Sequence, residues 1–98
     1  MAMVNKGSTQ GRLNQNDAAM ATYDEVLRRF GDSAEPALRE SVARALVNKG
    51  ITQGQLNQNE AAMATYDEVL RRFGDSVEPV LREQVAMALV NKGITKAD

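Results

Sequence analysis

The chain has 98 residues, a formal net charge of −1 and neither cysteine nor histidine, and its length suits one small domain. Without these two residue types it has no disulfide, no thiol chemistry, and neither the commonest general base nor the commonest metal ligand, so we expect no enzyme, metal ion or cofactor. Charges of both signs alternate and no apolar stretch could span a membrane, so we expect no nucleic-acid or membrane partner and a cytoplasmic location.

The N-terminal half is predicted to form three helices. The first is short, at about 2–13, and the second lies at 17–30. Gly31-Asp32-Ser33 then interrupts the pattern, because glycine suits the left-handed residue that closes a helix and Ser33 can cap the next one. A third helix of about 20 residues is predicted at 35–56, where apolar residues recur at three- and four-residue steps.

The C-terminal half is predicted to form two more helices. Asn57-Gln58-Asn59 is the turn before a helix at 60–73, in which Asn57 tolerates a left-handed backbone and Asn57 or Asn59 can cap the helix. A fifth helix is predicted at 78–95. Acid precedes base at four-residue spacing in two expected surface ion pairs, Asp67–Arg71 and Glu68–Arg72.

These helices follow from a repeated unit. Residues 4–46 and 47–89 are identical at 36 of 43 positions, and residues 90–95 begin a partial third copy. A fixed period of roughly 20–50 residues is typical of a solenoid, in which each unit buries its apolar face against the next. We therefore predict an all-α helix-hairpin solenoid that forms a single domain over 1–98, with about two repeats and an extra C-terminal helix.

The repeat resembles the tetratricopeptide repeat, whose pattern is W-x₂-L-G-x₂-Y, A-x₃-F and P over about 34 residues. Gly50 and Ala62, where two helices should cross closely, match this pattern together with Tyr66, as do Gly7, Ala19 and Tyr23 in the first copy. Leu46 stands at the tryptophan position, and three further positions depart from the pattern: Lys49, Gln53 and Gly74. The repeat is also about nine residues longer than the family's, an excess assigned to Glu35–Ala43 at the start of the long helix.

The resemblance implies a protein that binds extended peptides or partner helices on a concave surface lined by the first helix of each repeat. The positions expected to line it are Asn5, Val47, Asn48, Ile51, Gln55 and Asn91. An asparagine amide offers a peptide group both a donor and an acceptor. The alternative is that these asparagines are ordinary surface residues copied by duplication.

The few differences between the copies point to self-association. Three of the seven place larger or more apolar residues on or just before the fifth helix: Val77, Val80 and Met87 replace Ala34, Ala37 and Arg44. A terminal solenoid helix usually becomes polar on its open side, and this one does the reverse. The expected oligomer interface consists of Val77, Val80, Met87, Leu89 and Val90, and the alternative is neutral drift or better packing within the chain.

The sequence thus predicts a non-enzymatic protein–protein interaction scaffold that associates through its open terminal helices. A closed dimer is the first expectation and a head-to-tail array the second. The alternative function is a purely structural self-assembly module, or a fragment of a longer repeat array, with no separate peptide ligand.

Overall fold

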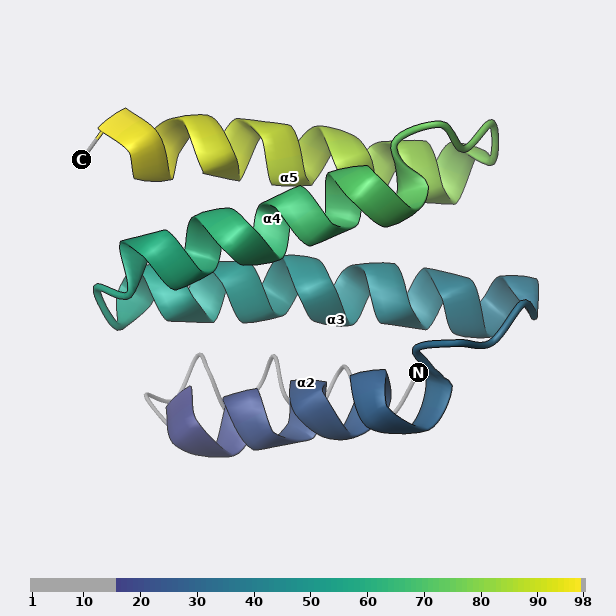
Figure 1. Cartoon of the computed structure of the whole chain (residues 1–98), viewed down its shortest axis with the longest axis horizontal. Helices are drawn as coiled ribbons and strands as arrows, with labels where there is room; N and C mark the ends of the chain where they lie inside the picture. The colour runs from purple at the N-terminus through teal and green to yellow at the C-terminus, as the bar shows by residue number, and fades with distance from the viewer. Residues whose placement is uncertain (1–15, 98) are drawn as a thin grey trace.

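The computed structural model describes residues 16–97, which form four helices: α2 (Asn16–Phe30), α3 (Pro36–Gln55), α4 (Asn59–Phe73) and α5 (Pro79–Ala97). They run alternately in opposite directions, so that α3 and α5 are parallel and α4 lies against both (Figure 1). This confirms the predicted helical solenoid and places each described helix boundary within two residues of its expected position. The predicted helix at 2–13 lies outside the described residues.

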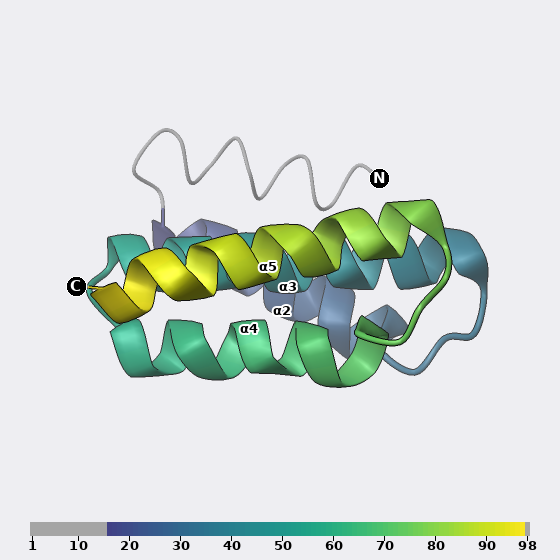
Figure 2. The same ribbon diagram turned by 90° about the horizontal axis from the view of Figure 1, so that it is seen from above.

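Two clusters of buried side chains hold the helices together. The larger joins α3, α4 and α5, and the smaller joins α2 to α3 around Tyr23 and Ala45. Seen from above, α3 and α5 form one layer and α4 lies below them (Figure 2). The long helices therefore contact each other directly as well as through the short ones.

The turn between α3 and α4 shows why an asparagine stands there. Asn57 has φ 61°, as predicted, and lies in the left-handed region that asparagine tolerates better than most residues. The N–H of Gln58 donates to the Gln53 carbonyl at 2.8 Å, and the N–H of Asn57 donates to the Gly54 carbonyl at 3.0 Å. This pair of bonds is a Schellman motif that satisfies two carbonyls at the end of α3.

Three of the predicted helix-end roles are wrong. The residue before α4 is Gln58, which makes no side-chain capping bond, so neither Asn57 nor Asn59 caps that helix. No described glycine has a positive φ; Gly31 and Gly74 instead permit a close approach, since a Cβ there would lie 2.4 Å from the Leu27 or Leu70 carbonyl oxygen. Ser33 accepts a hydrogen bond from the Glu35 N–H at 3.1 Å and so orders the turn one residue before α3 rather than capping it.

The additional residues of the repeat lengthen α3 at its N-terminal end. α3 has 20 residues and α4 has 15, so the first turns of α3 extend past the end of its antiparallel partner. Arg39 in this extension pairs with Glu78, next to α5, at 3.1 Å. The extension therefore links one repeat to the next.

Candidate interaction surfaces

The exposed side of α3 is a stripe at helical spacing, opposite the surfaces that contact α2 and α4. It is made of Ala37, Glu40, Arg44, Asn48, Ile51 and Gln55, which are exposed or partly exposed. The corresponding α5 stripe is Val80, Glu83, Met87, Asn91 and Ile94. Because α3 and α5 are parallel and in contact, the equivalent positions of the two stripes lie on neighbouring helices.

The stripes differ in character although their sequences are copies. On α3 the Arg44 guanidinium pairs with Glu40 at 3.0 Å. On α5 methionine replaces this arginine, Glu83 has no ion-pair partner among the described residues, and Met87 and Ile94 are 39% and 59% exposed. The surface is thus polar and charged on α3 and largely apolar on α5.

The structure separates the predicted peptide-binding residues. Asn48, Ile51 and Gln55 lie on the α3 stripe, and Asn91 lies at the matching place on α5. The Asn91 amide donates to the Met87 carbonyl at 2.8 Å, which fixes its orientation. Val47 is only 1% exposed and packs in the core, so a ligand on the surface would not reach it. Asn5 lies outside the described residues.

A second exposed face of α5 consists of Ala86, Leu89, Val90 and Gly93, which we call the terminal face. The identical residues of α3 are Ala43, Leu46, Val47 and Gly50, all buried beneath α4 and α5. Leu89 and Val90 are 53% and 62% exposed, whereas Leu46 and Val47 are 4% and 1% exposed. The same side chains therefore form core in one repeat and open surface in the next.

The residues predicted for an oligomer interface are all exposed, but they do not share one face. Leu89 and Val90 belong to the terminal face, and Val80 and Met87 to the α5 stripe. Val77, the most exposed at 86%, lies in the turn before α5. The prediction omitted Gly93 and Ile94, which a comparison of residues 90–95 with residues 47–52 could have suggested.

Gly50 and Gly93 show the difference between the two environments most directly. A Cβ at Gly50 would lie 2.3 Å from Cε1 of the Tyr66 ring, whereas a Cβ at Gly93 would have nothing within 4 Å. Gly50 therefore creates the close helix crossing that its family-like position predicted. Gly93 leaves the same space on the surface of α5, and no ring occupies it; we call this space the notch at Gly93.

Tyr66 connects three helices from the middle of α4. Its ring packs on Gly50 of α3, and its hydroxyl lies near Thr95 of α5. Burial raises the pKa of this phenol above its ordinary value, and the nearby Thr95 offsets only part of that effect. Tyr66 therefore stays neutral and serves as a packing residue.

Two departures from the family pattern have structural explanations. Lys49 pairs with Asp24 of α2 at 2.8 Å, and the equivalent Lys92 pairs with Asp67 of α4 at 2.6 Å. Gln53, which is 7% exposed, accepts a hydrogen bond from the Thr65 hydroxyl at 2.5 Å. Polar contacts between helices thus replace the apolar contacts that leucine and an aromatic residue would make.

The predicted pairs on the helix surface are partly correct. Glu68 pairs with Arg72 as expected, and also with Arg71, so the prediction of an Asp67–Arg71 pair is wrong because Asp67 instead reaches Lys92. The two arginines, Arg71 first, lower the pKa of the Glu68 carboxyl to about 2. The equivalent Glu25 pairs with Arg28 and Arg29 in the same way.

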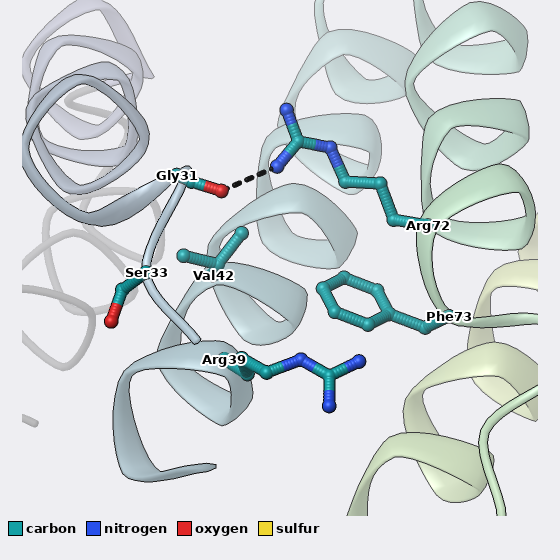
Figure 3. A pocket seen from close by; sticks show the side chains of 6 residues that line it. All are labelled: Gly31, Ser33, Arg39, Val42, Arg72 and Phe73. Atoms are coloured by element: carbon teal, nitrogen blue, oxygen red, sulfur yellow. Dashed lines mark hydrogen bonds between the residues drawn. The ribbon is translucent and has the colours of Figure 1, made fainter. Parts of the chain in front are cut away.

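A pocket of about 180 Å³ lies where the turn after α2 meets α3 and α4 (Figure 3). The Arg72 guanidinium donates to the Gly31 carbonyl across it at 2.9 Å, and the Arg39 guanidinium lies 5.6 Å from the centre of the Phe73 ring. Both cations already have ion-pair partners, Arg72 with Glu68 and Arg39 with Glu78. This pocket is therefore a joint between repeats rather than a ligand site.

The described residues show no other chemical site. They contain no cluster of three or more acidic, histidine or cysteine side chains that could hold a metal ion. None of the four helices is long and apolar enough to cross a membrane.

Comparison with known protein families gives two matches, both to models described as tetratricopeptide repeat. One covers residues 1–33 and the other covers residues 43–75. Residues 34–42 lie between them, within one residue at each end of the segment assigned to the longer helix. No similar curated protein and no similar solved structure was found.

Proposed function

The chain belongs to the tetratricopeptide-repeat family, whose repeats generally mediate protein–protein interaction, and from this we propose that it is a scaffold that associates with its own copy through α5. One observation carries the proposal: in the described residues, every large hydrophobic side chain that is exposed belongs to α5 or to the turn before it. An exposed apolar patch is typical of a protein interface, and α5 carries Leu89 and Val90 on its terminal face and Val80, Met87 and Ile94 on its stripe.

The free energy gained by burying these exposed side chains is of the size that association requires. Fully burying one such side chain contributes about 1.5–3 kcal/mol. Two or three buried on each partner would offset a substantial part of the cost of bringing two chains together, which is about 4–15 kcal/mol. A closed dimer, in which both copies use the same patch, is the simplest arrangement.

Absolute molar mass measured by light scattering over a concentration series tests this proposal. The mass should rise from the monomer value of 10.7 kDa toward twice that value. Met87→Arg, which restores the residue found at the same place in the first copy, and Val90→Arg should both shift the mass toward the monomer. Ala64→Arg, at an exposed site on α4, is the control. A constant monomer mass, or an equal effect of the control, would contradict the proposal.

A second function, capture of an extended peptide, is favoured by the adjacent α3 and α5 stripes. Asn48 and Asn91 occupy the same place on neighbouring parallel helices, and an asparagine amide can hold a peptide group through its donor and its acceptor. Asn48→Ala should weaken binding of any extended peptide selected on this protein, whereas Gln58→Ala, in the turn, should not. Unchanged affinity of the Asn48 variant would exclude this function for the stripe.

A further inference from the structure

The buried face of α3 indicates what kind of element the terminal face of α5 would contact. Leu46, Val47 and Gly50 on α3 are buried beneath α4 and α5, with Gly50 against the Tyr66 ring of α4, whereas their copies Leu89, Val90 and Gly93 on α5 are uncovered. Since the covered and uncovered residues are identical, the occupant of the first set is a template for the occupant of the second.

Two further contacts between α4 and the preceding repeat have counterparts at α5 or in the turn before it, in which one of the two partners is absent from the described residues. Arg39 of α3 lies against the Phe73 ring, while its copy Arg82 is exposed and makes no ion pair or ring contact among the described residues. The Gly31 carbonyl accepts a bond from Arg72, while none of the described side chains donates to the copy of this carbonyl at Gly74. A phenylalanine and the arginine preceding it, as in Arg72-Phe73, would complete both contacts.

From these unfilled contacts we propose that the terminal face binds an amphipathic helix of the α4 type from another polypeptide. The helix would carry alanine, tyrosine, valine and phenylalanine at the spacing of Ala62, Tyr66, Val69 and Phe73, and its tyrosine would enter the notch at Gly93. A second α5 does not fit this description, because α5 contains no aromatic residue to fill the notch. This proposal goes beyond the proposed self-association, because it assigns the terminal face to a different partner and names that partner's chemistry.

The probe is a synthetic peptide of residues 57–76, fluorescently labelled and cross-linked between positions 67 and 71. Both positions are exposed in α4, so the link leaves the apolar face free. The link is needed because a helix of this length is marginal on its own. Anisotropy titration with the 98-residue chain should show saturable binding with one peptide per chain.

Gly93→Ala is the decisive variant. The added methyl group would occupy the space of the tyrosine ring, as a Cβ at Gly50 would, and should weaken binding about tenfold, the fold-change that corresponds to a cost of about 1.4 kcal/mol. Gly54→Ala, which also has nothing within 4 Å of its new Cβ, should bind the peptide normally. Tyr66→Ala in the peptide should weaken binding to the unchanged chain at least as much.

Two results would overturn the inference: no binding, or binding that is indifferent to Gly93→Ala. Light scattering of the same mixtures distinguishes its failure from that of self-association. A dimer that persists with no bound peptide removes the inference and leaves self-association intact. A monomer that binds the peptide does the opposite.

Discussion

Alanine at Gly50 and alanine at Gly93 should have opposite effects on stability, although the local sequence around them, Val-Asn-Lys-Gly-Ile-Thr, is the same. Replacing a mid-helix glycine by alanine stabilises a helix by about 1 kcal/mol when nothing else changes. Gly93 meets this condition, since a Cβ there has open space around it. Gly93→Ala should therefore raise the free energy of unfolding by up to about 1 kcal/mol.

At Gly50 the same methyl group would lie 2.3 Å from the Tyr66 ring. That ring cannot swing away, because Tyr66 is 1% exposed and is held between α3 and α5. Overpacking costs about 1–3 kcal/mol, and a contact this short belongs in the upper part of that range, about 2–3 kcal/mol, which exceeds the gain in helix propensity. Gly50→Ala should therefore lower the free energy of unfolding by about 1–2 kcal/mol.

Thermal and urea unfolding followed by circular dichroism measures both effects. For a domain of this size each kcal/mol shifts Tm by about 4–8 °C, so the two variants should differ by roughly 10 °C or more. The urea m-value should be the same for both, which would show that only stability changed. Equal Tm shifts of the two variants would refute the assignment of Gly50 to a close crossing and of Gly93 to an open face.

Three further outcomes are expected. The folded-state pKa of Glu68 is about 2, below its ordinary 4.5, so its contribution to the free energy of unfolding is present above about pH 4.5 and is lost as the pH falls toward 2. Glu68→Gln should therefore cost about 1 kcal/mol at pH 7 and almost nothing at pH 2, measured by urea unfolding. Thr65→Val leaves the Gln53 amide oxygen unpaired and should cost about 1–3 kcal/mol, whereas adding Gln53→Leu should recover part of it; a cost that the second change deepens would contradict this. A double-mutant cycle on Asp24 and Lys49 should give a coupling of about 0.2–1 kcal/mol that shrinks in high salt, and a coupling insensitive to salt would show that the pair is not a surface ion pair.

The helices were predictable because their signals are local. Apolar spacing located α3 and α5, and Asn57 marked the turn through its tolerance of a positive φ. The greater length of α3 was also predictable, because the nine residues beyond the family's repeat length had to lengthen one of the helices. Predicting these helices and turns requires no knowledge of which residues from other helices pack against them.

The contacts between helices were not predictable by the same means. Asp67 has Arg71 at an ideal distance along its own helix, yet it pairs with Lys92 because packing brings α5 within reach. Val47 has the spacing of a groove residue, but the rotation of α3 turns it into the core. Comparing equivalent positions in the two copies, rather than reading one copy, would have indicated both the recurring Asp24–Lys49 pair and the open notch at Gly93.

In the described residues α3 has close backbone contacts with each of the other three helices, whereas the backbone of α2 comes close to that of α3 alone. Local opening is then expected to begin at an end and spread one helix at a time, so backbone amides of α5 should exchange with deuterium sooner than those of α3. A partner bound to the terminal face would suppress local opening that begins at α5. Its binding would be recorded as slower exchange throughout α5, including amides of residues whose own side chains face away from the partner.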